Sequence, residues 1–331
     1  MPVAVIASLL FAVIPTLCYV AIVWWCDRYE KEPFWLLAAA FLWGAVPAIL
    51  LAIGGEVILD PASGAGSDLG RELISSSIVA PIVEEFVKAL ALLIIFTRFR
   101  DEFDGVLDGI IYGALVGFGF AMTENFFYLI DEFNAGGWDS FGTLAFFRTI
   151  LFGLNHAFFT AFAGAGFGLA RSSRSRAFKI FAPLVGLLIG IGFHALHNLG
   201  ATLTSATILS LGISLIANAG GVLIIVVILV LALRQEKRWI AEELRPEIGI
   251  LLTVDEYRTA QSPVQRMKAR RRAVSSLGLA RSRKVGQFYN LLTELAFRTH
   301  RYRNGRASAK DLRVIPLLRD RIARLRPQMT A

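Results

Sequence analysis

The chain has 331 residues, 55% of them hydrophobic, and a formal net charge of +8. Its mean hydropathy of +0.58 excludes an ordinary soluble domain, because the apolar residues recur in runs long enough to cross a bilayer. The two cysteines, Cys18 and Cys26, lack the spacing of a metal site and are expected to be buried thiols.

Seven apolar runs predict an all-α fold, a polytopic membrane helical bundle of about seven transmembrane helices. The first run is too long for a cleavable signal and lacks its basic start, so we expect it to stay as a helix. The pattern predicts a transmembrane domain over 1–233 and a basic helical region over 234–331. The predicted spans are 3–26, 34–58, 72–97, 107–130, 142–170, 180–202 and 208–233.

Basic residues alternate between the predicted loops. Loops one, three and five contain Lys or Arg, whereas the segments "DPASGAGSD", "DEFNAGGWDS" and "ATLTSAT" of loops two, four and six contain none. From residue 234 onward there are 23 Lys and Arg against 9 Asp and Glu, a net charge of +14. The positive-inside rule therefore predicts a multi-pass protein of the plasma membrane, with its amino terminus outside and its carboxyl terminus in the cytoplasm.

The third span, "IVAPIVEEFVKALALLIIF" at 78–96, contains Glu84, Glu85 and Lys88 in its middle. A charged side chain at mid-bilayer costs roughly 2.5–3.5 kcal/mol, so these groups must face the bundle interior, pair or change protonation. Lys88 has the i,i+4 and i,i+3 spacing of a helix ion pair with the two glutamates. One lysine neutralises only one carboxylate, and the surplus charge indicates chemistry.

The fourth span carries "FGFAMTENFFY", in which Phe120, Glu124 and Tyr128 share one helix face. Glu124 is therefore expected among aromatic rings, where a carboxylate needs a cation or a metal to stay ionised. Arg148, near the outer end of the fifth span, is expected to be interfacial or ion-paired.

Histidines occupy the next two spans. In "GLNHAFFTAFAGAGFG", His156 and Thr160 share a face, and the small residues that follow allow close helix approach. In "GIGFHALHNLG", His194 and Asn198 are i,i+4, whereas His197 points roughly 100° away from Asn198. Each of these residues alone is better explained as a packing group than as a ligand.

The predicted depths of the polar groups agree. At about 1.5 Å per residue, Glu84, Glu124, His156 and His194 lie roughly 10–20 Å from the outer surface. Four helices thus direct an acid or an imidazole to one layer, between the membrane centre and the outer leaflet. Water activation requires such groups together.

The chain resembles the PrsW family of intramembrane proteases over about 30–235, in four elements on successive spans. The elements are "EEFVK" at 84–88, "FAMTE" at 120–124, His156 with Thr160, and "HALHN" at 194–198. The resemblance implies a peptidase that makes the first cut, near the extracytoplasmic side, in a single-span membrane protein such as an anti-sigma factor. The related CAAX prenyl proteases have His where this chain has Glu124, which argues against a prenylated substrate.

The resemblance implies a hydrolase with one of two chemistries. In the metalloprotease form, Glu124, His156 and His194 bind Zn²⁺, and Glu84 or Glu85 is the general base. In the metal-free form, Glu84 and His156 activate the water directly.

The other residues of the motif are assigned supporting roles. Lys88 keeps one glutamate ionised, and in the metal-free form His194 and Asn198 donate to the oxyanion. Tyr128 shares a helix face with Glu124, and Thr160 shares one with His156. His197 lies outside the motif and is either an extra ligand or a neighbour.

The region 234–331 is basic and partly amphipathic. The segments "VGQFYNLLTELAFRTHRYRNG" and "KDLRVIPLLRDRIARLR" predict two helices, with His300 solvated. We expect this region to contact membrane lipid through anionic headgroups. It has no recognised nucleic-acid-binding motif, so nucleic acid is not an expected partner.

Two other functional classes suit an apolar bundle with polar groups inside it. A non-proteolytic membrane scaffold of the same fold would keep the histidines but has little need of Glu84 and Glu85 together. A proton-coupled transporter would also use buried Glu and His, but no convincing repeat relates the two halves of the chain.

Overall fold

The computed structural model describes residues 2–59, 68–205, 207–307 and 309–330. Within these ranges the chain is almost entirely helical and no β-strand forms, which confirms the all-α prediction. The predicted loop "DPASGAGSD" at 60–68 lies outside the described residues except for Asp68. The chain divides into two compact units, one made of Met1–Cys26 and Glu32–Leu229, the other of Asp27–Lys31 and Val230–Ala331.

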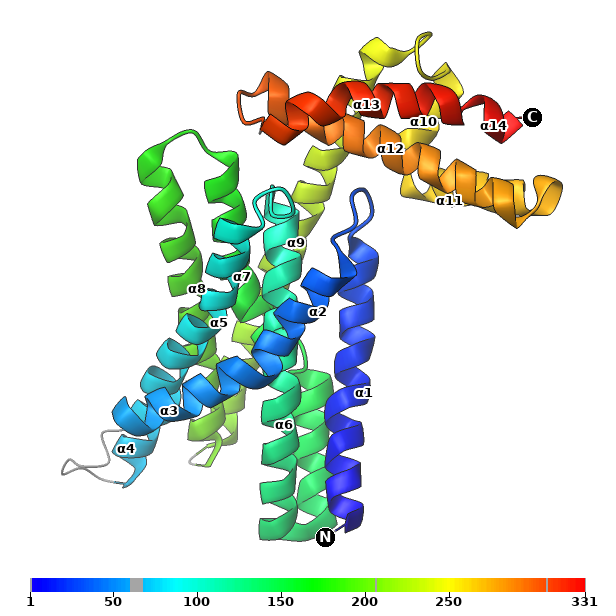
Figure 1. The fold of residues 1–331 in the computed structure, drawn as a ribbon. Coiled ribbons are helices and arrows are strands. Elements are labelled where there is room, and N and C mark those ends of the chain that lie inside the picture. The colour runs from blue at the N-terminus through cyan, green and yellow to red at the C-terminus, as the bar shows by residue number, and fades with distance from the viewer. Residues whose placement is uncertain (1, 60–67, 206, 308, 331) are drawn as a thin grey trace. The chain divides into compact units, whose positions relative to one another are not determined.

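Long apolar helices make up the first unit (Figure 1). Most are apolar all round, as expected of helices that are surrounded by protein or lipid. They are α1 (Pro2–Cys26), α2 (Phe34–Trp43), η1 (Gly44–Ala48), α3 (Ile49–Leu59), α4 (Asp68–Ile74), η3 (Ser75–Val79), α5 (Ala80–Arg98), α6 (Val106–Ala145), η4 (Phe146–Leu151), α7 (Asn155–Ser172), α8 (Arg176–Thr202), η5 (Leu203–Ser205), η6 (Ile208–Ser210) and α9 (Leu211–Leu244), whose last part belongs to the second unit.

Several stretches of the described chain are long and apolar enough to cross a membrane, which indicates a multi-pass membrane protein. The five are Pro2–Cys26, Phe34–Leu59, Val106–Ser172, Arg176–Thr202 and Ile208–Glu247. The predicted spans 107–130 and 142–170 fall together in the third of these. The predicted span 72–97 is not among the five, because Glu84, Glu85 and Lys88 make α5 too polar. The count of seven spans and their orientation stay predictions.

The chain reverses direction at Gly137, inside α6 (Figure 1). This glycine has a φ of 71°, a left-handed value that residues with a Cβ rarely adopt. Leu129 before the turn packs with Phe141 and Ala145 after it. Val106–Ser172 therefore contains two antiparallel arms, and the second arm leads back into α7.

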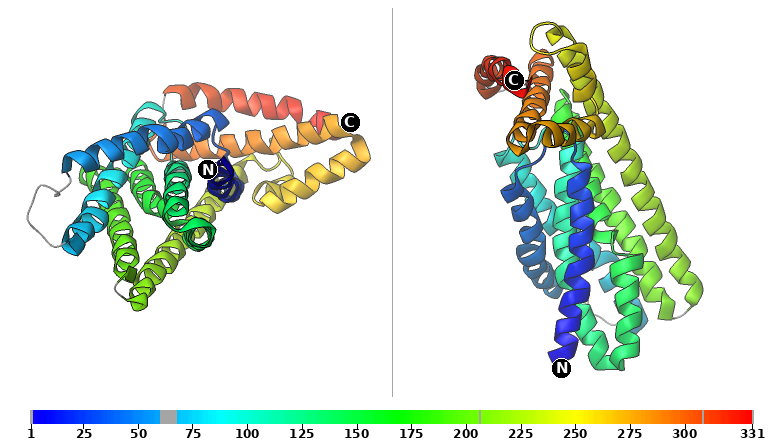
Figure 2. Two further views of the ribbon diagram at one scale, coloured as in Figure 1. Left: turned by 90° about the horizontal axis from the view of Figure 1, so that it is seen from below. Right: turned by 90° about the vertical axis from the view of Figure 1, so that its right-hand side faces the viewer.

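Close packing holds the arms and their neighbours together. Helix α1 packs along α6, with the ring of Tyr19 stacked on that of Phe118 at 5.9 Å (Figure 2). A Cβ at Gly109 would overlap the carbonyl oxygen of Gly164, and one at Gly117 would overlap the backbone of α7. Such contacts between small residues are typical of helices that associate in a membrane. The stretch "GAGFG" at 164–168 therefore serves helix packing.

Two π-helical segments precede the helices that carry the candidate site. Segment η3 leads into α5, and η4 ends shortly before α7. A π-helix changes the i→i−4 hydrogen-bond pattern and is frequent at functional sites. Polar side chains from later helices bind both segments: Asn198 Nδ2 donates to the carbonyl oxygen of Ser76 at 2.8 Å, and Asn218 Nδ2 to that of Leu151 at 3.1 Å.

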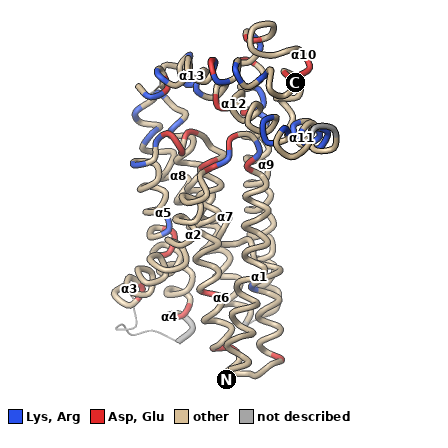
Figure 3. Tube along the Cα trace, turned by 45° about the vertical axis from the view of Figure 1, so that its right-hand side comes forward, with Lys and Arg blue, Asp and Glu red and all other residues tan. Residues whose placement is uncertain are grey.

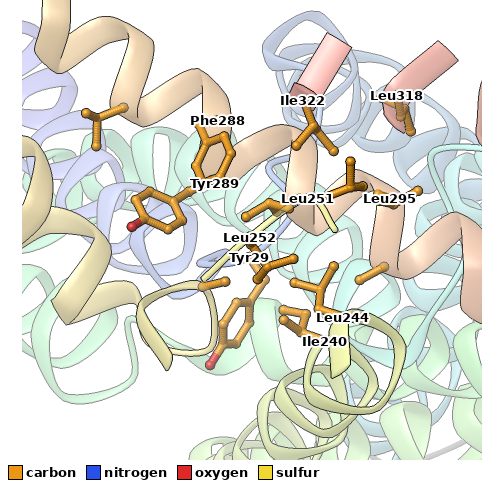
Figure 4. Packing of buried hydrophobic residues seen from close by; sticks show 14 of the residues in the cluster. Tyr29, Ile240, Leu244, Leu251, Leu252, Phe288, Tyr289, Leu295, Leu318 and Ile322 are labelled. Carbon is orange, nitrogen blue, oxygen red and sulfur yellow. The ribbon is translucent and has the colours of Figure 1, made fainter. Parts of the chain in front are cut away.

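The second unit is a small helical domain formed around the end of α9. Its apolar core includes Ile240, Leu244, Phe288, Leu295 and Ile322 (Figure 4). Lys and Arg are concentrated on its helices, especially α11 to α13 (Figure 3). These helices are η7 (Arg245–Glu247), α10 (Val254–Ala260), α11 (Pro263–Leu277), α12 (Leu279–Arg303), α13 (Ala309–Leu325) and α14 (Pro327–Thr330).

Two expectations about single residues are wrong. His300 is not solvated: its ring stacks on Trp239 with centroids 4.4 Å apart, and its Nδ1 lies 3.4 Å from Glu243. Burial lowers the pKa of His300, although Glu243 acts in the opposite direction. Cys18 is exposed, because the buried stripe of α1 consists of small residues between Ala4 and Thr16.

Candidate active site

Helix α5 places Glu84, Glu85 and Lys88 on its buried face. The Nζ atom of Lys88 donates to Glu84 Oε2 at 3.0 Å and to Glu85 Oε1 at 2.8 Å. Lys88 is fully buried and Glu85 is 1% exposed. The predicted i,i+3 and i,i+4 ion pairs are therefore present, and the three charged groups turn into the bundle.

Helices α7 and α8 bring two histidines to these charges. His156 Nδ1 lies 3.1 Å from Lys88 Nζ, and His194 Nδ1 lies 3.1 Å from Glu85 Oε1. The two imidazole rings are 5.0 Å apart and nearly perpendicular. Residues from three helices thus form one contiguous cluster.

The hydrogen bonds define the tautomer of each histidine. An ammonium group can only donate, so His156 Nδ1 accepts from Lys88 and its Nε2–H donates to Glu124 Oε2 at 2.9 Å. His194 Nδ1–H donates to Glu85, which leaves a lone pair on Nε2. Each imidazole therefore has a carboxylate on its N–H side, and the other ring nitrogen, His156 Nδ1 or His194 Nε2, lies 3.9 Å from Glu84 Oε2.

Glu124, on α6, lies at the outer edge of this cluster and pairs with Arg148. The guanidinium of Arg148 contacts Glu124 Oε2, donates from Nε to Asn125 Oδ1 at 2.7 Å and lies over the ring of Tyr128 at 3.9 Å. The reversal at Gly137 brings Arg148 to Glu124, 24 residues earlier. Arg148 is thus ion-paired, one of the two roles that the sequence allowed.

The two glutamates of α5 differ in how fully they are bound. Glu85 accepts from Lys88 and His194 at Oε1 and from Thr160 Oγ1 at Oε2, at 2.9 Å. Glu84 accepts one hydrogen bond, from Lys88 at Oε2. Glu85 therefore connects Lys88, Thr160 and His194 through hydrogen bonds, and Glu84 keeps lone pairs for another partner.

Two predicted site residues lie beside the cluster rather than in it. The side-chain amide of Asn198 donates its hydrogen bond to the carbonyl oxygen of Ser76, as described above. His197 packs against Phe152 with ring centroids 4.7 Å apart, and its ring lies 6.2 Å from that of Phe159. Phe159 in turn stacks on His194 at 4.5 Å.

Four of the predicted residues could hold a metal ion. Glu84, Glu85, His156 and His194 each offer a ligand atom, and these atoms lie within 4.8 Å of one another. This set shares both histidines with the predicted zinc ligands. Glu124, the third predicted ligand, instead hydrogen-bonds the far nitrogen of His156, the position of a carboxylate that orients a metal-binding histidine.

Sequence reasoning left out Glu56, which lies on α3 within electrostatic reach of Glu84, Glu124 and Lys88. The sequence offered one signal for Glu56: it is an acidic residue near the end of the apolar run 34–58. The cluster without it contains three carboxylates and two cations, a net charge of −1 with neutral histidines. Burying so many charges is unfavourable unless they pair as they do here.

Comparisons with known proteins agree on one family. The model of the PrsW family intramembrane metalloprotease matches residues 32–233. Protease PrsW of Geobacillus kaustophilus is 32% identical over 160 residues, 48% of this chain and 65% of that protein. Protease PrsW of Clostridioides difficile is 36% identical over 123 residues, 37% of this chain and 50% of that protein.

A further relative, Protease PrsW of Bacillus subtilis, is 29% identical over 154 residues, 46% of this chain and 63% of that protein. The chain thus spans between half and about two thirds of the length of these curated relatives. No solved structure matches the chain.

Proposed function

This chain belongs to the PrsW family of intramembrane metalloproteases, and we propose that it is itself a peptidase that cleaves a single-span membrane protein near its extracytoplasmic side. One observation carries the proposal: Glu84, Glu85, His156 and His194 bring ligand atoms within 4.8 Å of one another, inside a bundle of membrane-type helices. A mixed set of carboxylates and imidazoles around a buried position is suited to activating water.

Glu84 is the general base in this proposal. It accepts a hydrogen bond from Lys88 at Oε2, and its carboxylate has further lone pairs for a water molecule. After taking a proton from water, the carboxylic acid delivers it to the leaving amine. Glu85 instead holds Lys88, Thr160 and His194 in place and is a positioning residue.

The imidazoles stabilise the charge that forms on the substrate carbonyl. When His194 carries a second proton, that proton is on Nε2, which lies 3.9 Å from Glu84 Oε2. This donor serves the oxyanion. Asn198, which the sequence suggested as a second donor, here holds η3 through Ser76, so its part is to position α5.

The donor set also fits a zinc ion. His156 Nδ1, His194 Nε2 and Glu84 Oε2 would hold it, and Glu84 Oε2 lies 3.9 Å from each of the two nitrogens. When bound, Zn²⁺ supplies a Lewis acid and makes a coordinated water more acidic. Glu124 would then fix the orientation of His156 from behind.

The two chemistries differ in their response to chelation. Purified protein is treated with a chelator, its metal content is measured, and cleavage is assayed before and after addition of Zn²⁺. Activity that is lost and then restored supports the metalloprotease form. Full activity of verified metal-free protein supports the form in which Glu84 and His156 activate water directly.

The proposed substrate is a membrane-anchored anti-sigma factor, which the family resemblance suggests. The proposed orientation places the amino terminus outside and the tail in the cytoplasm, as the distribution of Lys and Arg predicts. The tail would then lie beside anionic headgroups. Helix α11 supports this, because its exposed surface combines Val264 and Met267 with Lys268 and Arg271.

The test is co-expression with a tagged single-span anti-sigma factor. The proposal expects a shortened product with the natural chain and none with Glu84→Ala or Glu124→Ala at equal membrane levels. Cleavage retained by both variants would overturn the site. If the natural chain and a panel of such substrates give no product, a scaffold or transporter becomes the better assignment.

A further inference from the structure

Three polar side chains next to the candidate site have buried atoms that find no hydrogen-bond partner among the residues that the structure describes. They are Asn155, with both amide atoms unpaired, Asn218, with Oδ1 unpaired, and His197, with Nδ1 unpaired. Asn155 is 3% exposed. Leaving such groups unpaired inside a protein costs about 1–3 kcal/mol each, so a partner outside the chain is expected for them.

All three residues are arranged around one turn, Leu151–Asn155, which joins η4 to α7. Asn218 reaches this turn from α9 through its hydrogen bond to the Leu151 carbonyl. His197 reaches it from α8 by packing on Phe152. Ser214, one turn before Asn218 on α9, donates to the His197 carbonyl at 2.6 Å and so ties α8 to α9 at this level.

The unpaired atoms match the hydrogen-bonding capacity of water. They comprise two amide oxygens, one NH₂ group and one imidazole nitrogen, and a buried water typically makes about three hydrogen bonds to such groups. A substrate segment would need an opening, whereas Asn155 is almost completely enclosed. The position is close to the reaction: Asn155 precedes His156, and the ring of Phe159 lies 4.5 Å from that of His194 and 6.2 Å from that of His197.

We propose that Asn155, His197 and Asn218 form a water-binding site that supplies water to Glu84. A peptidase inside a membrane has to keep water near its base, because the surrounding hydrocarbon contains none. The supply role rests on the proposed peptidase function, whereas the binding of water at this turn does not. The two parts can be tested separately.

X-ray hydroxyl-radical footprinting of the purified full-length protein tests the binding of water. Radicals formed from a bound water oxidise buried side chains beside it, so we expect oxidation of Phe152 and His197. Phe288, in the fully buried core of the second unit, is the internal control and stays unmodified. Protection of Phe152 and His197 equal to that of Phe288 would overturn the site.

Two variants remove the polar atoms while keeping most of the volume. Asn155→Leu and His197→Phe should each lower the oxidation of Phe152 and slow cleavage about tenfold, the effect of one lost hydrogen bond. Their melting temperatures should change little, because each substitution removes a buried polar group together with its hydrogen bond to water. The second variant keeps the ring against Phe152 in case the first does not fold.

Thr149→Val is the matched control. Thr149 is also buried and lies near the turn, but its hydroxyl is paired with the Ala145 carbonyl at 2.7 Å. This variant should keep both oxidation and cleavage. Lower oxidation with unchanged cleavage in Asn155→Leu and His197→Phe would overturn the supply role. Oxidation of Phe152 in a protein that cleaves none of the substrates tried would count against the peptidase function and leave the water site standing.

Discussion

Lys88 Nζ and His156 Nδ1 lie 3.1 Å apart, although 68 residues separate them in the chain. Because an ammonium group has no lone pair, this contact makes Nδ1 of His156 the acceptor and sends its Nε2–H to Glu124. The lysine therefore connects the glutamates of α5 to the histidine of α7. Lys88 thus hydrogen-bonds Glu84, Glu85 and His156, and these bonds determine which of their atoms stay available to other partners.

Glu84 and Glu85 should respond differently to the same substitution. Glu84→Gln should lower cleavage by about 10²-fold or more, with little change in stability, because Lys88 keeps Glu85. Glu85→Gln should lower the free energy of unfolding by about 3–5 kcal/mol, because it weakens three buried contacts at once. Thermal unfolding in detergent and the substrate-cleavage assay measure the two effects. Equal destabilisation by both variants would contradict the division of roles.

Arg148 and Glu124 should behave as a coupled pair. Arg148→Met leaves the carboxylate of Glu124 without its cation and should destabilise the protein by about 2–3 kcal/mol, since the pair is only partly exposed. Adding Glu124→Gln removes the unpaired charge and should restore part of that loss. A double-mutant cycle of unfolding free energies measures the coupling. Strictly additive effects would show that the contact contributes nothing.

Lys88 should compete with zinc for the same atoms. Its ammonium binds Glu84 Oε2 and His156 Nδ1, two of the three proposed zinc ligands. Lys88→Met removes the competing cation and should raise the affinity for Zn²⁺ by at least about tenfold. Isothermal titration of chelator-treated protein measures it. The control is Glu84→Gln in the Lys88→Met background, which should lose the gain; unchanged affinity in Lys88→Met would place zinc elsewhere.

Helix contact at Gly117 should be essential to the position of His156. A Cβ at residue 117 would overlap the His156 carbonyl oxygen, so Gly117→Ala should push α7 away. We expect the free energy of unfolding to fall by about 1–3 kcal/mol and cleavage to be lost. Gly142→Ala is the control, because a Cβ there meets nothing within 4 Å. Melting temperatures of the two variants check the contrast. A tolerated Gly117→Ala would show that α6 and α7 are less closely packed.

The stability of the second unit should fall in acid because of His300. Burial lowers the pKa of His300, so folding favours the neutral ring. A lowered pKa in the folded state means that this contribution is fully present above the ordinary value of 6.5 and is lost as the pH falls below it. Tryptophan fluorescence of the full-length chain reports unfolding, and Trp239, which stacks on His300, is one of its six tryptophans. His300→Gln should flatten the acid limb below about pH 6.5; an unchanged limb would contradict this cause.

Local spacing predicted the contacts within a helix. The pairs of Lys88 with Glu84 and Glu85 follow from i,i+4 and i,i+3 positions, and an all-α bundle follows from the apolar runs. The common depth estimated from the sequence predicted that Glu124, His156 and His194 lie in the same membrane layer as Glu84 of α5. In the structure, hydrogen-bonding distances connect these helices.

Contacts that depend on bends and on irregular turns could not be predicted in this way. The partner of Arg148 depends on the reversal at Gly137, which lies in the predicted loop four, but a predicted loop does not say which side chains of its two arms meet. The role of Asn198 depends on a π-helical turn at Ser76, whose hydrogen-bond pattern no residue preference indicates. The depth of a residue along its helix predicts which residues share a membrane layer, but it does not predict which of their atoms form contacts.

The central claim is that Glu84 directs water onto a peptide bond. The most direct measurement is cleavage of a purified single-span substrate by this protein in liposomes containing H₂¹⁸O, followed by mass spectrometry of the products. Hydrolysis predicts one ¹⁸O atom in the new carboxyl terminus, a cut in the outer half of the span and no product with Glu84→Gln. Unlabelled product, or the same labelled product from Glu84→Gln, would contradict the account.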